Sequence, residues 1–178
     1  WTNGKVIVTA STDVSGYTLQ TSKDAKTWTS ISTQEFETNG KVYARLWDGI
    51  NAGGYSVGNV TNIDKLAPNS FTPTATSTTN SITVTASTTD ATATDDYASS
   101  GIAGYRFKLD SGSWSAYQTS GTYKWSNLTQ TTNHTITVEA KDNAGNTKQG
   151  TVSKGTGTVA GLTTANTKFT AEPTGWTN

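Results

Sequence analysis

The sequence predicts an all-β protein: two tandem antiparallel β-sandwiches, followed by one further strand. Three observations support this prediction. Apolar residues alternate with polar ones over short stretches, as on half-buried strands. Gly, Asn, Asp and Ser separate these stretches, as turn residues do. The same order of stretches occurs twice along the 178 residues, which indicates an internal duplication.

The duplication is read from four pairs of segments. KVIVTAS at residues 5–11 and SITVTAS at residues 81–87 align without a gap. Three more pairs follow in the same order: SGYTLQT (15–21) with AGYRFKL (103–109), KTWTS (26–30) with GSWSA (112–116), and KVYARLWDGINAGG (41–54) with HTITVEAKDNAGN (134–146). Each copy therefore contains a strand, a Gly-aromatic strand, a Trp strand and a long strand that ends in an Asp turn.

The expected elements follow from this alignment. In the first copy we expect strands near 5–11, 16–22, 27–33, 35–38, 41–48 and 54–62, and in the second near 70–77, 81–88, 104–110, 113–119, 122–127, 134–141 and 147–153. Asn39-Gly40 has a two-residue hairpin signature. The expected inward residues are Val6, Val8, Tyr17, Leu19, Trp28, Val42, Ala44 and Leu46, and then Ile82, Val84, Tyr105, Phe107, Trp114, Ile136, Val138 and Ala140.

The composition argues against several classes of protein. Charged residues are 15% of the chain, and 13 basic residues balance 13 acidic ones, so no basic patch indicates nucleic-acid binding. Cys is absent, which excludes disulfides and thiol chemistry. No stretch is long and apolar enough to cross a membrane. No signal peptide is present, so we interpret the chain as a mature or excised fragment.

The C-terminal residues repeat an earlier strand. FTAEPTGWTN at 169–178 aligns without a gap to FTPTATSTTN at 71–80, which we expect to be the first strand (the A strand) of the second copy. The first copy has no counterpart before Trp1. WTN occurs at both ends, at residues 1 and 176, so the sequence has the form of one period of 176 − 1 = 175 residues.

Several of these motifs resemble a known family. GWTN and WTNGKV, NIDKLAP, SGIAGYRF and EAKDNAGN are similar to tandem bacterial immunoglobulin-like repeats, which are related in shape to fibronectin type III modules. The resemblance implies domains at 1–63 and 64–154, and a linker and donor strand at 155–178. It also implies a structural, non-enzymatic role in an extracellular fibre, stalk or surface adhesin.

The expected mechanism of assembly is strand complementation between copies. A sandwich without its A strand leaves an unpaired sheet edge, and residues 169–178 of another copy would fill it. The partner would then be a further copy of the repeat, covalently continuous or separate. The expected interface residues are Trp1, Thr2, Asn3, Val6, Val8, Phe169, Ala171, Pro173 and Trp176.

Acidic residues in turns suggest a cation site. Sandwich loops meet at one end, and oxygen-rich loops at a domain junction suit calcium. The candidate ligands are Asp64, Asp90, Asp95, Asp96 and Asp142. The alternative is that these residues only form turns by bonding their own backbone. No complete Asp-x-Asp-x-Asp-Gly loop is present, and no cofactor is required by the sequence.

Other candidates are weaker. Trp28 and Trp114 recur in register and are expected in the core, whereas Trp47 and Trp125 are candidate contacts for a glycan or host protein. A binding module or an enzyme accessory domain is therefore the alternative function. His134 is expected at the surface, and Glu139 is expected to point outward, which leaves no buried acid for an isopeptide bond. Sequons permit N-glycosylation at Asn59, Asn127 and Asn133.

Overall fold

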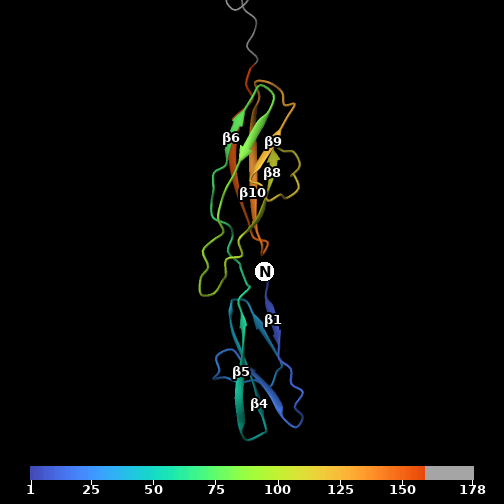
Figure 1. Ribbon diagram of the computed structural model, residues 1–178, viewed down its shortest axis with the longest axis vertical. Coiled ribbons are helices and arrows are strands. Elements are labelled where there is room, and N and C mark those ends of the chain that lie inside the picture. The colour runs from blue at the N-terminus through green and yellow to red at the C-terminus, as the bar shows by residue number, and fades with distance from the viewer. Residues whose placement is uncertain (159–178) are drawn as a thin grey trace, which may run out of the picture.

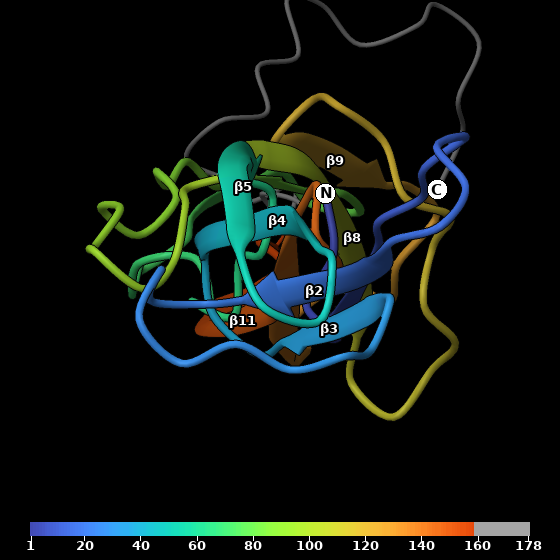
Figure 2. The same ribbon diagram turned by 90° about the horizontal axis from the view of Figure 1, so that it is seen from below.

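The computed structural model describes residues 1–158, and within them the chain is all-β. Two sandwiches lie end to end along the long axis, and the N-terminus lies where they meet (Figure 1). The first sandwich contains β1 to β5 and the second contains β6 to β11. Figure 2 views the molecule along this axis, with the first sandwich in front of the second. No helix among the described residues is long and apolar enough to cross a membrane.

The first sandwich has one sheet of two strands and one of three. β1 (Val6–Thr9) pairs with β3 (Thr33–Phe36). The facing sheet has the order β2 (Thr18–Ser22), β4 (Gly40–Trp47) and β5 (Ala52–Val60). All of these pairings are antiparallel.

The second sandwich has two three-stranded sheets. One has the order β6 (Thr74–Ser77), β7 (Ile82–Thr85), β9 (Thr122–Trp125). The other has the order β11 (Thr147–Gly155), β10 (Asn133–Asp142), β8 (Ile102–Leu109). β6 is the A strand expected from the sequence, and its counterpart is missing from the first sandwich in the described residues.

Two predicted strands and one predicted turn are not formed. Residues 27–33 and 113–119 are reduced to isolated bridges at Thr29 and Gln118. Asn39 and Gly40 do not form a hairpin, because β3 and β4 belong to different sheets. The Asn39 side chain instead exchanges hydrogen bonds with the backbone of Ile63, at 2.9 and 3.0 Å.

The two cores differ in size. The core of the second sandwich contains the larger buried set: Ile82, Val84, Ala86, Tyr105, Phe107, Ile136, Val138 and Ala140. Among the described residues, the buried apolar set of the first sandwich is Phe36, Val42, Val60 and Ile63, with Val6 and Val8 packed against them. The small first core indicates that this sandwich depends on contacts from outside its own strands.

Six residues expected in the cores lie outside the two buried clusters. Leu19, Ala44 and Leu46 are half-buried on the inner face of the first sandwich but do not join its core. Tyr17 is 51% exposed. Trp28 and Trp114 are half-buried and stack on arginines, with Arg45 Cζ 4.1 Å from the Trp28 ring centroid and Arg106 Cζ 4.6 Å from that of Trp114. Recurrence in register therefore identified a repeated arginine–tryptophan stack on the outer face of each sandwich, not a repeated core position.

Candidate functional site

Three carboxylates meet at the junction between the sandwiches. Asp64 lies in the segment joining them, Asp90 in the loop after β7, and Asp142 at the end of β10. One oxygen from each lies within 4.8 Å of the others. An ion with Ca²⁺–O distances of about 2.3–2.6 Å would fit between oxygens at this spacing.

Two of these carboxylates are completely shielded from water. Asp64 is 0% exposed and Asp142 is 1% exposed. Their hydrogen bonds come from neutral groups: Asp64 accepts from the amide of Ser100 at 2.8 Å, and Asp142 accepts from those of Gly145 and Asn146 at 2.6 and 2.8 Å. Within residues 1–158, no lysine, arginine or histidine forms an ion pair with any of the three. Clustered negative charge away from water is costly without a cation.

The other two predicted ligands do not join this cluster. Asp95 and Asp96 are exposed and lie farther along the loop that carries Asp90. The backbone oxygen of Asp96 accepts a hydrogen bond from the amide of Asn39 in the first sandwich, at 2.7 Å. Asp95 and Asp96 therefore occupy the part of the loop that reaches the neighbouring sandwich.

Sequence reasoning did not identify the residues that couple the sandwiches. Tyr97, in this same loop of the second sandwich, packs against the core of the first. The amide of Ala98 donates to the oxygen of Ile63 at 2.9 Å, and Asn146 Nδ2 donates to that of Asp64 at 2.9 Å. A single Tyr in a Thr-, Asp- and Ser-rich loop, with no counterpart in the first copy, is the one sequence signal of this role.

The second feature of functional interest is the open edge of β1. In the second sandwich, β7 pairs with β9 on one side and with β6 on the other. β1, the equivalent of β7, pairs only with β3 among the described residues. Within residues 1–158, the other edge of β1 therefore has no strand to pair with its backbone donors and acceptors.

A groove accompanies this edge. In the second sandwich, the segment leading into β6 covers β11 closely: a Cβ placed on Gly150 would lie 2.7 Å from the oxygen of Phe71. The register pairs Val138 with Gly150, and the equivalent pair in the first sandwich is Ala44 with Ser56. There, an open groove of about 300 Å³ is lined by Ser11, Thr12, Leu19, Ala44, Arg45, Leu46, Gly54 and Ser56.

The predicted interface residues are only partly within the described chain. Thr2 forms a parallel bridge with Ile63, Trp1 is 57% exposed and Asn3 is exposed. Val6 and Val8 face the first core. Phe169, Ala171, Pro173 and Trp176 lie outside the described residues.

The two tryptophans predicted to contact a ligand are placed differently. Trp47 is half-buried on the outer face of β4, near Arg45. Trp125, the other candidate contact, packs against the second core beside Tyr123, with ring centroids 4.8 Å apart. Trp125 faces inward because it lies two residues from Tyr123 on one strand, so both side chains lie on the same face.

The sequon asparagines Asn59, Asn127 and Asn133 are all exposed. Modification at these positions stays a prediction.

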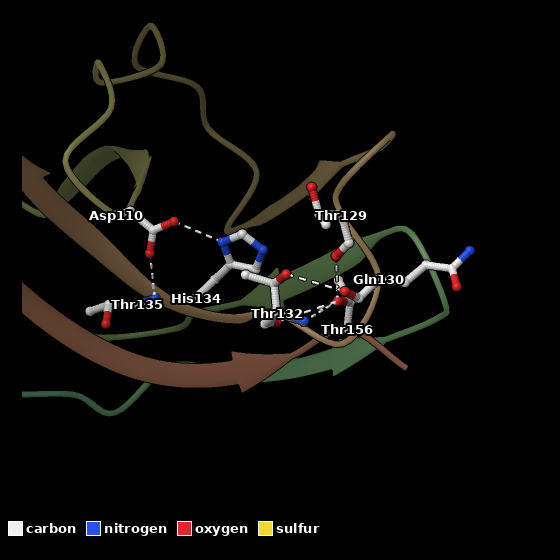
Figure 3. A network of polar contacts seen from close by, with 7 residues as sticks. All are labelled: Asp110, Thr129, Gln130, Thr132, His134, Thr135 and Thr156. Atoms are coloured by element: carbon white, nitrogen blue, oxygen red, sulfur yellow. Dashed lines mark hydrogen bonds and ion pairs between the residues drawn. The ribbon is translucent and has the colours of Figure 1, made fainter. Parts of the chain in front are cut away.

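His134 is more buried than expected. Its side chain is 10% exposed, and Nδ1 lies 2.7 Å from Asp110 Oδ2 (Figure 3). Its Nε2 is buried and has no hydrogen-bond partner within the described chain. A nucleophilic dyad would need a hydroxyl at that nitrogen, and no residue of 1–158 places one there. The hydrogen bond from His134 and the amide of Thr135 hold the pKa of the Asp110 carboxyl below its usual value.

Glu139 was expected to be solvated, but it is 4% exposed. It points away from the core, as expected, into a box formed by Arg106, Tyr117 and Gln149. Burial favours a higher pKa, but hydrogen bonds from Tyr117 and Gln149 and the charge of Arg106 outweigh it, so the pKa of Glu139 is lowered. Burial and the bond to Glu139 raise the pKa of Tyr117 to about 12.

Comparison with known proteins supports the fold. No protein-family model and no curated protein matches the sequence. Domains A168-A170 of titin match with a TM-score of 0.51 and 12% identity over 88% of this chain, which spans 60% of that structure. Fibronectin(III)-like modules of CbhA from Clostridium thermocellum match with a TM-score of 0.40, 16% identity, and 88% and 87% of the two chains. Chicken CNTN1 FN1-FN3 domains match with a TM-score of 0.37 and 15% identity, over 88% of this chain and 61% of that structure.

The topology and the titin likeness define the class: this is an all-β chain with an immunoglobulin-like or fibronectin type III-like fold. This fold hosts many functions, so the function has to be argued from the junction and the open edge.

Proposed function

We propose that this chain is a structural repeat unit of an extracellular fibre or long surface adhesin, assembled head to tail. An A-strand segment like residues 169–178 completes the first sandwich of the next copy. The open edge of β1, with the uncovered groove beside it, carries this proposal. β6 fills the equivalent place in the second sandwich.

The polarity of the chain supports this arrangement. β6 leads away from the junction, and the described chain leaves the second sandwich at the far end from the first (Figure 1). A further copy placed at that end would receive its A strand from the chain segment that precedes it, as the second sandwich does. In that register Phe169 takes the place of Phe71, which packs against the second core.

A chain with two consecutive periods provides the test. In the copy that follows residues 169–178, we expect the β1 amides that face the open edge to exchange with solvent at least about tenfold more slowly. Burying Phe169 alone is worth about 1.5–3 kcal/mol. Hydrogen exchange with mass spectrometry measures both copies of β1.

Phe169→Ala is expected to remove this protection, whereas Leu162→Ala, outside the ten-residue segment, is the control. Equal exchange in both copies of β1 would refute complementation within a continuous chain. Protection that appears only with rising concentration of the single-period chain would assign the contact to separate subunits.

We also propose that Asp64, Asp90 and Asp142 hold a calcium ion that stiffens the junction. Two buried carboxylates that have no positive partner among residues 1–158 support this. Asp90 lies on the loop that carries Tyr97, so the ion would fix that loop against the first sandwich.

Calcium is therefore expected to raise the unfolding temperature of the full chain. A site that binds only the folded state contributes about 2.7 kcal/mol at 100 times its dissociation constant. Calorimetry in excess calcium and in chelator measures the difference. Asp90→Asn should abolish it, while Asp96→Asn, on the same loop, should leave it intact. An unfolding temperature that is independent of calcium would contradict the site.

A further inference from the structure

The outer face of the first sandwich carries an arginine stacked on a tryptophan, as the second sandwich does. The carboxylate that pairs with the arginine in the second sandwich has no counterpart in the first. In the second sandwich, Glu139 of β10 accepts from Arg106 of β8 at 2.8 Å, and Trp114 stacks over that guanidinium. The β10 and β4 registers align Glu139 with Arg45 and Arg106 with Gln20. Both sandwiches therefore have a guanidinium stacked on a tryptophan, but only in the second does a carboxylate pair with it.

The Arg45 guanidinium is fixed by stacking on this face, and most of its N–H groups are left without a protein acceptor among the described residues. Its guanidinium carbon lies 4.1 Å from the Trp28 ring centroid and 5.8 Å from that of Trp47. Nε donates to Gln20 Oε1 at 2.9 Å, which uses one of its five N–H groups. No carboxylate among residues 1–158 forms an ion pair with it.

The surroundings are cationic, aromatic and accessible. The outward residues of β4 are Lys41, Tyr43, Arg45 and Trp47, and the outward rows of β2 and β5 contain no acid. Tyr55 is 55% exposed, and its ring lies 6.1 Å from that of Trp28. The nearest acid along the chain, Asp48, accepts hydrogen bonds from the amides of Ile50 and Asn51 in its own turn. Asp24, which precedes Trp28, likewise accepts from the amides of Lys26 and Thr27.

We infer that this face binds an acidic saccharide, a sugar carrying a uronic or sialic carboxylate. Arg45 matches a carboxylate in charge and in hydrogen-bond geometry, as Arg106 already does within this molecule. The exposed ring of Tyr55 and the edges of Trp28 and Trp47 offer apolar surface to the flat face of a pyranose. Gln20 and the tyrosine hydroxyls supply donors and acceptors for sugar hydroxyls.

This site does not rest on strand complementation, because its side chains lie on the outer face of β2, β4 and β5. The groove is lined mainly by inward residues of these strands and shares only Arg45 with this site. It also does not rest on calcium, so the test is done in chelator. The full chain is titrated with a panel of uronic- and sialic-acid oligosaccharides and with neutral oligosaccharides of equal length. Calorimetry and tryptophan fluorescence report binding.

Saturable binding of at least one acidic oligosaccharide, and none of its neutral counterpart, is expected. Arg45→Gln should weaken binding about tenfold or more, the loss expected for a hydrogen bond to a charged group. Lys148→Gln removes an exposed charge from the second sandwich and is the matched control. Tyr55→Ser should weaken binding several-fold without loss of fold, as checked by thermal unfolding.

Three results would overturn the inference. They are no binding across the acidic panel, equal binding of neutral and acidic sugars, or an Arg45→Gln variant that binds as tightly as Lys148→Gln.

Discussion

Replacing Arg106 with methionine is expected to lower the free energy of unfolding of the second sandwich by about 3–5 kcal/mol at neutral pH. The Glu139 carboxylate is 4% exposed, and Arg106 provides its positive partner through Nη2 at 2.7 Å. Removing Arg106 leaves a buried charge without its positive partner, stabilised only by the hydrogen bonds from Tyr117 and Gln149. Urea unfolding of the full chain measures the change.

Arg45→Met is the matched control. It removes a guanidinium from the same kind of tryptophan stack, but no carboxylate loses an ion-pair partner. An exposed cation–π contact is worth only about 0.5–1 kcal/mol. Equal losses from the two substitutions would show that stacking, and not the ion pair, carries the stability of these boxes.

The pH dependence gives a second test of the Arg106 prediction. The folded-state pKa of Glu139 is lowered. The ionised group therefore contributes stability above its unfolded pKa, and this contribution is lost as the pH falls through the folded pKa. Without Arg106 that pKa should rise, so acid should destabilise the variant less. The gap between wild type and Arg106→Met should narrow toward about pH 3.

The fold could be predicted because alternation and turn residues are local signals. They located the paired strands, including β6, and the period of two placed Val138 and Ala140 in the core. The alignment of the Gly-aromatic strands was shifted by two residues, since the sheet register places Leu19, not Tyr17, opposite the equivalent of Ala140. A shift of two keeps the same face, so the pattern alone could not reveal it.

The sites were harder to predict. Asp64 and Asp142 are 78 residues apart in sequence, and their meeting depends on how one loop docks between sandwiches. Loop docking has no periodic signal, so Asp95 and Asp96 were not separable from Asp90. Trp28 and Trp114 were wrongly predicted to lie in the cores. The pattern of apolar residues does not show that an arginine, and not the core, packs against each ring.

Replacing Gly150 with valine is expected to displace the A strand of the second sandwich and to cost about 3 kcal/mol or more. A Cβ at this position would lie 2.7 Å from the backbone oxygen of Phe71 and 2.9 Å from Pro73 Cδ. Backbone cannot yield as a flexible side chain can. The loss of unfolding free energy should therefore reach or exceed the upper end of the usual range for overpacking, about 1–3 kcal/mol. Hydrogen exchange should show β6 losing protection before β10.

The matched substitution in the first sandwich is Ser56→Val, and its expected outcome depends on whether the groove is filled. In a single-period chain, Ser56 is exposed and a valine should change stability by less than about 0.5 kcal/mol. In a two-period chain, the same valine in the following copy would meet Phe169 or Ala171, as valine at 150 meets Phe71 and Pro73. The protection of β1 in that copy should then be lost. Tolerance of valine in both contexts would mean that residues 169–178 do not occupy the groove. Ser56 is not a member of the carboxylate cluster, and its side chain lies on the opposite face of the sheet from that of Arg45, so this result separates strand complementation from both binding sites.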